Sequence, residues 1–222
     1  KENNLGTDEM WGLVLRLAIP AMLAQFINVL YSIVDRIFIG NIPGIGATAL
    51  AGVGICGPIV TLITSFSMWV GIGGSPLMSI KMGENDLKEA HRIMANCFFM
   101  MVMMGIVISI LVILFRQPLL MLFGASTVTF PYADTYMTIY AAGSIFAIVS
   151  MGMNIFIICQ GYSKIAMFSV IVGAVCNMVL DPVFIFGFDM GVAGACTDGF
   201  LCICIAVFIW TSSACTDYIW AI

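Results

Sequence analysis

The chain has 222 residues, of which 62% are hydrophobic and only 9% are charged, and its formal net charge is −4. A soluble domain is usually about 45–50% apolar and about 25% charged, so this chain lacks the polar residues needed to cover a surface in contact with water. The composition therefore predicts an integral membrane protein embedded in a lipid bilayer, and the shortage of Lys and Arg argues against nucleic acid as a partner.

Six apolar stretches are long enough to cross a bilayer, because a hydrocarbon core of about 30 Å needs roughly 20 apolar residues in a helix. Glycines, prolines and charged residues separate these stretches. The start of the chain, "KENNLGTDEMWG", is polar and acidic, so we expect no cleavable signal peptide there. In chain order the predicted transmembrane helices span residues 13–39, 48–80, 93–115, 131–158, 164–186 and 191–211.

The charges between the helices predict their orientation, because cytoplasmic loops carry an excess of Lys and Arg. With the N-terminus inside, Arg116 is the only cation in an outer loop, and Arg36 lies in the membrane near the outer end. We therefore expect both termini in the cytoplasm. The cations on or near the cytoplasmic side are then Lys1, Arg16, Lys81, Lys88, Arg92 and Lys164.

Two acidic residues lie in the outer halves of the first and fifth predicted helices. Asp35 precedes Gly40 by five residues, and Asp181 precedes Gly187 by six. Both helices run in the same direction and rise about 1.5 Å per residue, so the two carboxylates are expected at a similar depth. A charged side chain inside a membrane helix costs about 2.5–3.5 kcal/mol. If these helices are neighbours, the acids are expected to share one polar site suited to a proton or a monovalent cation.

Polar residues extend this candidate site along the first helix. Asn28, Tyr31 and Asp35 are spaced three and four residues apart, so they form a polar stripe on an otherwise apolar helix. Pro20 lacks a backbone N–H and interrupts the helix below the stripe. A pairing of Asp35 with Arg36 near the headgroups is the simpler interpretation.

The fifth helix carries a matching set. Asn177 lies one turn before Asp181, and its amide oxygen is a further candidate ligand for a cation. Pro182 opens the backbone beside Asp181, and an interrupted helix next to intramembrane acids is a recurring feature of transporters. The simpler interpretations are a turn at the outer end for Asp181 and helix packing for Asn177.

The eight cysteines do not indicate a metal centre or a disulfide framework. None forms a Cys-x-x-Cys motif, and His91, the only histidine, lies in a charged loop. We interpret the cysteines as free thiols that act as small apolar residues.

The second predicted helix is rich in glycine, which favours close contact with a neighbouring helix. A hinge within the helix bundle is the alternative interpretation. The glycines are Gly52, Gly54, Gly57, Gly71, Gly73 and Gly74.

Five segments, taken together, resemble a known family. They are "LAIPAMLAQFINVLYSIVDRIFIG", "GIGGSPLMSIKMGENDLKEA", "LFGAS", "PYADTYMTIYAAG" and "QGYSKIAMFSVIVGAVCNMVLDPVFIFGFDMGVAGA". In order and spacing they are similar to the bacterial branch of the multidrug and toxic compound extrusion (MATE) transporters, from about Leu5 to Ala195. The resemblance implies about twelve helices in two six-helix lobes. Residues 1–222 then form the N-terminal lobe, and the second lobe is absent.

The resemblance also implies antiport in a bacterial plasma membrane. A drug-like, often cationic compound leaves while sodium or protons enter, and no other cofactor is involved. The implied cation site consists of Asp35, Asn177 and Asp181. The implied bending point on protonation is Pro20, and the corresponding tyrosines of helices one and four are Tyr31 and Tyr136.

The chain departs from the family pattern in two ways. With one lobe, the path between lobes is missing, so the chain is either truncated or pairs with a second copy. In helix six, Gly199 stands where the family has a threonine near the cation site, while Thr197 is two residues out of register and Asp198 is an additional acid.

Three alternatives to a working antiporter follow. A non-transporting half of such a transporter is one, and crosslinking in membranes would distinguish it from a homodimer. A lipid-linked sugar flippase of the wider superfamily is another, but it would need a basic cavity, and Arg36 is the only cation in the core. A membrane enzyme is disfavoured because no predicted helix supplies a histidine to activate a nucleophile.

Overall fold

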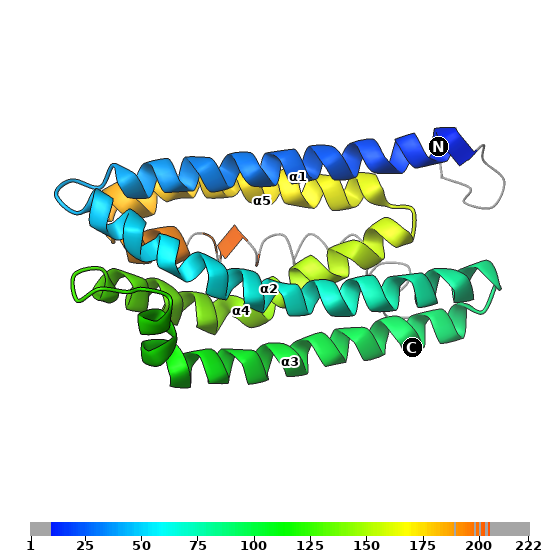
Figure 1. Cartoon of the computed structure of the whole chain (residues 1–222). Helices are drawn as coiled ribbons and strands as arrows, with labels where there is room; N and C mark the ends of the chain where they lie inside the picture. Colours follow the sequence, from blue (N-terminus) through cyan, green and yellow to red (C-terminus); the bar gives the residue numbers. More distant parts are fainter. Residues whose placement is uncertain (1–9, 189, 198, 200, 203, 205–222) are drawn as a thin grey trace.

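The computed structural model describes residues 10–188, 190–197, 199, 201–202 and 204, and these residues form helices with no strand among them. Each of the five long helices includes a segment apolar enough to cross a membrane, which confirms the all-α membrane fold. The elements are α1 (Met10–Gly40), α2 (Gly46–Gly83), α3 (Leu87–Leu122), α4 (Phe130–Cys159), α5 (Ser163–Pro182) and the π-helix η1 (Val183–Gly187), as Figure 1 shows.

The predicted sixth helix, 191–211, can be compared only at its beginning. Residues 192–197 are helical. Most of the remaining predicted span, together with the C-terminus, lies outside the described residues.

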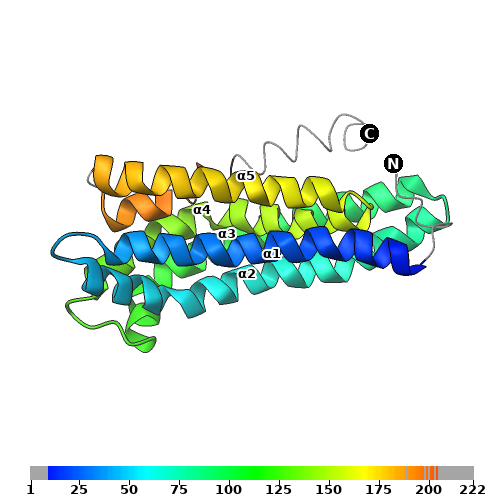
Figure 2. The same cartoon turned by 90° about the horizontal axis from the view of Figure 1, so that it is seen from above.

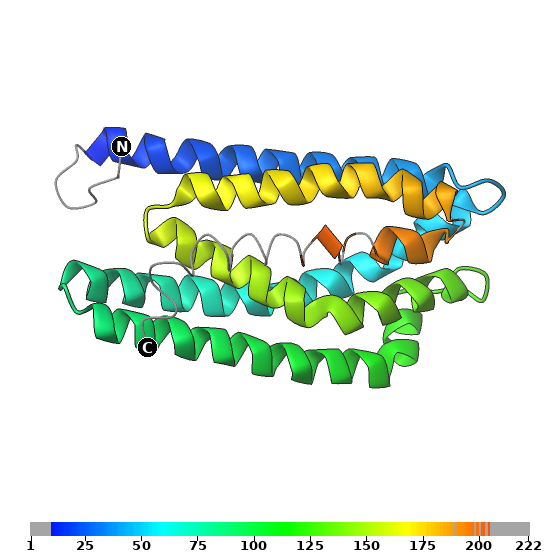
Figure 3. The same ribbon diagram turned by 180° about the vertical axis from the view of Figure 1, so that it is seen from behind.

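The long helices form two groups that lie side by side. The helices α2, α3 and α4 pack on one another, while α1 packs along α5 (Figures 1 and 2). Seen from behind, α4 leads through a short turn into α5, which then runs in the same direction as α1 (Figure 3). The first and fifth predicted helices are therefore parallel neighbours, as a shared acidic site requires.

Small residues allow α2 to approach α4 closely. Ser67 Oγ donates a hydrogen bond of 2.7 Å to the carbonyl of Ile148, and a Cβ added to Gly71 would lie 3.3 Å from the carbonyl of Gly152. Close contact therefore explains part of the glycine content of α2. A Cβ added to Gly52, Gly71 or Gly74 would meet atoms of a neighbouring helix. No atom lies within 4 Å of a Cβ added to Gly54, Gly57 or Gly73.

The predicted third helix, 93–115, is too short at both ends. At its beginning, the Asp86 carboxylate accepts a hydrogen bond of 3.2 Å from the backbone N–H of Glu89, which caps α3. Hydropathy identifies only the part of a helix inside the bilayer, whereas α3 begins earlier, in a polar stretch that contains the ion pair of Arg92 with Glu89. His91 consequently lies in α3 and not in a loop.

The other end of α3 continues through Pro118 to Leu122. Arg116, which was predicted in an outer loop, therefore lies in α3. Its Nε is 3.2 Å from Asp134 Oδ1, and it donates a hydrogen bond of 2.7 Å to Thr138 Oγ1. This ion pair joins the end of α3 to the beginning of α4.

The fifth helix, predicted over 164–186, changes its backbone geometry after Pro182. Without a backbone N–H at Pro182 the α-helical pattern is interrupted, and residues 183–187 form a π-helix in which Phe188 N–H donates to the Val183 carbonyl at 2.9 Å. Gly194, at the beginning of the sixth helix, packs on this turn. A Cβ there would lie 2.9 Å from the carbonyl oxygen of Phe184.

Replacing Gly194 with alanine should lower the melting temperature of the detergent-solubilised chain, because the new methyl group meets backbone atoms that cannot rotate away. Overpacking of this kind costs about 1–3 kcal/mol, and about 1 kcal/mol corresponds to roughly 2–4 °C in a chain of this size. Gly54→Ala is the matched control, since space is open there and alanine favours a helix. Thermal unfolding followed with a thiol-reactive fluorophore measures both. Equal melting temperatures for the two variants would contradict the packing of Gly194.

Candidate functional site

The centre of the candidate site is a buried acid–amide pair on α5. Asp181 is 0% exposed and Asn177 is 6% exposed. They lie one turn apart, and Asn177 Nδ2 donates a hydrogen bond of 3.3 Å to Asp181 Oδ1. The predicted spacing of these two residues therefore places both side chains inside the protein and in contact.

The first helix brings a second carboxylate to this pair. Because α1 packs along α5, the partly buried Asp35 lies close enough to Asp181 for an electrostatic interaction. Asp35 Oδ1 and Asn177 Oδ1 are both buried, and neither accepts a hydrogen bond within the described residues. Buried oxygen atoms in this state are costly unless a proton, an ion or water satisfies them.

Two tyrosines of α4 complete one side of the site. The rings of Tyr136 and Tyr140 stack with centroids 6.2 Å apart and an angle of 9° between their planes. Tyr136 interacts electrostatically with Asp35, and Tyr140 with Tyr31. Tyr140 was missed in the sequence, although its position four residues after Tyr136 places both on one helix face.

The described part of the sixth helix borders this cluster with thiols. Cys196 Sγ contacts the carbonyl oxygen of Tyr136 at 3.4 Å, and Cys202 interacts electrostatically with Tyr31. Thr197 donates its hydroxyl to the carbonyl of Ala193 in its own helix, at 2.8 Å. Asp198 lies outside the described residues.

The oxygen atoms of the site could accept a proton or hold a hard cation. Carboxylate and amide oxygens are ligands for hard cations, whereas transition metals favour nitrogen and sulfur. Within the described residues no group of three or more His, Cys, Asp or Glu side chains could hold a metal ion. The described cysteines also form no disulfide with one another, and Cys215 lies outside the described residues.

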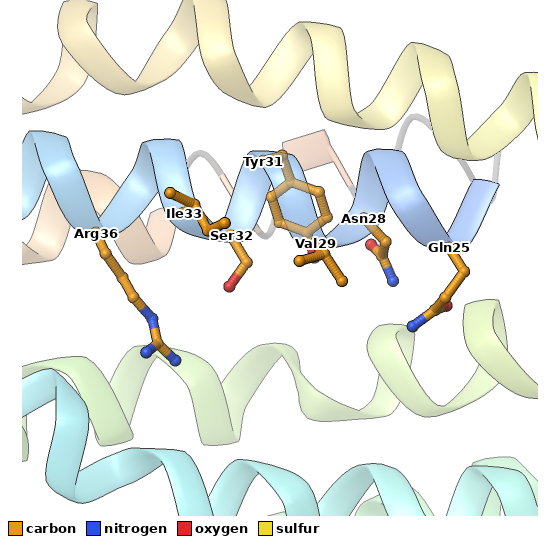
Figure 4. A pocket seen from close by; sticks show the side chains of 7 residues that line it. All are labelled: Gln25, Asn28, Val29, Tyr31, Ser32, Ile33 and Arg36. Carbon is orange, nitrogen blue, oxygen red and sulfur yellow. The ribbon is translucent and has the colours of Figure 1, made fainter. Parts of the chain in front are cut away.

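The face of α1 adjacent to Asp35 lines a separate groove of about 410 Å³. In Figure 4 Gln25, Asn28, Ser32 and Arg36 extend to the same side of the helix. Their spacing of three, four and four residues explains this common direction. Gln25 and Ser32 were missed, although they share this spacing. The complete lining is Gln25, Asn28, Val29, Tyr31, Ser32, Ile33 and Arg36.

Asp35 and Arg36 therefore belong to different surroundings. Successive residues of an α-helix point about 100° apart, so Asp35 faces α5 and the tyrosines of α4, whereas Arg36 lines the groove. Tyr31 contributes to both, because it lines the groove and also interacts with Asp35. Pro20 is buried further along α1, which continues through it as a helix.

The MatE family model matches residues 20–183, a range that includes Asp35, Asn177 and Asp181. The chain belongs to the MatE family. Among curated MatE relatives, the multidrug export protein MepA of Staphylococcus haemolyticus (strain JCSC1435) is 24% identical over 182 residues, which are 82% of this chain and 40% of MepA.

Solved structures agree with this membership. A chain named protein A is 33% identical, with a TM-score of 0.87 over 98% of this chain and 49% of its own length. A crystal structure of MATE in the bent conformation is 25% identical, with a TM-score of 0.85 over 93% of this chain and 46% of its own. The match therefore covers less than half the length of each of these chains.

Replacing Asp35 with asparagine should raise the melting temperature at pH 8 by a few degrees, because it removes one of two neighbouring buried negative charges while keeping the shape of the side chain. Asp134→Asn is the matched control. Its carboxylate pairs with Arg116, so its loss should lower the melting temperature by a few degrees. Thermal unfolding in detergent measures the change in melting temperature of each variant. A fall in melting temperature for both variants would show that Asp35 and Asp181 do not repel each other in the folded chain.

Proposed function

We propose that this chain forms one six-helix lobe of a multidrug efflux antiporter. The observation that supports it most is the meeting of Asp35 with Asp181 and Asn177 inside a membrane protein of the MatE family. The relative MepA is named as a multidrug export protein. In this proposal, drug-like and often cationic compounds leave the cell while sodium or protons enter, and no covalent chemistry is involved.

The coupling ion would bind between α1 and α5. Asp35, Asn177 and Asp181 would hold sodium, and the two carboxylates would instead accept a proton in a proton-coupled transporter. A bound cation or proton supplies positive charge that offsets the repulsion between Asp35 and Asp181. With the ion bound, the two carboxylates can lie closer together and away from water. An ion that binds this conformation more tightly than a more open one shifts the equilibrium toward it.

The first helix would transmit this change to the transported compound. One face of α1 carries Asp35, and the adjacent face lines the groove with Asn28 and Tyr31. Pro20 offers a point at which α1 can bend, because a proline removes one helical hydrogen bond. The existence of a MATE crystal structure in a bent conformation supports this role.

A complete path is proposed to need a second lobe or a second copy of the chain, because the chain spans only 40% of MepA. The proposed location is the bacterial plasma membrane, with both termini in the cytoplasm. The orientation rests on the distribution of Lys and Arg.

In a transporter that contains this lobe with its second half, Asp35→Asn should abolish ion-coupled export of a fluorescent drug such as ethidium. The amide cannot take up a proton and attracts a sodium ion only weakly. Export from loaded proteoliposomes, measured with an inward sodium gradient and separately with an inward proton gradient, tests the role of Asp35 and identifies the ion.

The control is Glu89→Gln, which makes the same carboxylate-to-amide change at the exposed beginning of α3. It should export at the rate of the unmodified protein. Export by the Asp35 variant at that same rate would refute the proposed coupling site.

A further inference from the structure

The groove on α1 carries a positive charge in its lining. Arg36 is the only charged side chain in its lining, while Gln25, Asn28 and Ser32 add polar groups that can donate hydrogen bonds. All four extend to one side of α1 (Figure 4). The lining contains no carboxylate.

The guanidinium of Arg36 has no ion-pair partner within the part of the chain that the structure describes. The described ion pairs join Lys81 with Glu84, Arg92 with Glu89, and Arg116 with Asp134. Arg36 is exposed, and Asp35, which faces α5, interacts with it electrostatically without forming a salt bridge. An exposed cation on a membrane-spanning helix is costly unless it meets water or an anion.

We propose that this groove binds an oxyanion, so that the compound it accepts carries a carboxylate, sulfonate or phosphate group docked on Arg36. A guanidinium pairs with such groups through two parallel N–H···O bonds. The amides and hydroxyl at one-turn intervals along α1 then contact the rest of the polar head, while Val29 and Ile33 contact its apolar part.

This inference rests on the proposed function and refines its substrate class. Antiport of cationic drugs does not need Arg36 in the lining, whereas an anionic or zwitterionic amphiphile does. The oxyanion has two possible sources, a soluble organic acid or the phosphate of an anionic lipid, and both use the same contact with Arg36.

Binding to the purified chain in phosphatidylcholine nanodiscs tests the proposal without any ion gradient. Fluorescein at pH 8 is the anionic probe, and rhodamine 123, built on the same xanthene ring system, is the cationic probe. Fluorescence anisotropy should show tighter binding of fluorescein, and added salt should weaken it because the contact is exposed. Arg36→Gln should weaken fluorescein binding about tenfold, as expected for loss of a hydrogen-bonded charge, and leave rhodamine 123 binding equal or stronger.

Three comparisons make the result decisive. Arg36→Lys keeps the charge without the paired N–H groups, so it should retain part of the affinity. Arg92→Gln makes the same change at the exposed cytoplasmic end of α3, so it should bind fluorescein like the unmodified chain. In nanodiscs with phosphatidylglycerol, weaker fluorescein binding that depends on Arg36 would identify the lipid as the source of the oxyanion, and unchanged binding would identify a soluble acid.

Equal affinity of the unmodified and Arg36→Gln chains for fluorescein, preference for rhodamine 123, or no binding of fluorescein at all would overturn the proposal. Circular dichroism of the Arg36→Gln chain checks its helix content. Because this measurement involves no coupling ion, it can fail while Asp35 still couples export, and the export test can fail while Arg36 still binds an oxyanion.

Discussion

The structure depends on the cost of placing charge inside a membrane. Asp35 and Arg36 are neighbours in the sequence, and a pairing near the headgroups is the simpler interpretation of both. Consecutive side chains of a helix point about 100° apart, so the two lie in different surroundings, although the charge of Arg36 still acts on Asp35. Asp35 meets Asp181 and the tyrosines of α4, and Arg36 lines the groove on α1. Each charge therefore needs a polar environment of its own, and one helix separates the two.

Hydrogen bonds and close backbone contacts hold the group of α2, α3 and α4 together. Inside the group of α2, α3 and α4, Ser67 bonds the carbonyl of Ile148 and Ser109 bonds that of Ala141, and glycines bring the backbones together. The pair of α1 and α5 joins this group most clearly at one end. There a small cluster around Ile39 and Ile185 also includes Ala49 of α2 and Tyr136 of α4. Beside it, Phe38 of α1 packs edge to face on Phe186 of η1 at 6.4 Å.

Sequence patterns predicted the five described helices because long apolar stretches have few alternatives in a bilayer. They also predicted the meeting of Asp35 with Asp181, from equal depth and equal direction. The predicted bounds of α3 were wrong at both ends because hydropathy does not report how far a helix continues beyond the hydrocarbon core. Tyr140, Gln25 and Ser32 were missed for a different reason. Their spacing is visible in the sequence, but it does not say which neighbour each helix face meets, and that depends on the packing of α1 against α5.

Asp181 lies directly before the interruption of α5. A continuous α-helix satisfies its own backbone groups and leaves little freedom beside a buried carboxylate. Pro182 removes one donor directly after Asp181, and the chain continues as the wider turn of η1, a geometry often found at functional sites. The same turn carries Phe186, which packs on Phe38 of α1. A change of charge at Asp181 therefore acts on a locally irregular backbone that touches α1 three residues from Asp35. Both acids and the aromatic contact lie at one end of the α1–α5 pair, so an ion bound there would be linked to the shape of the helix that also lines the groove.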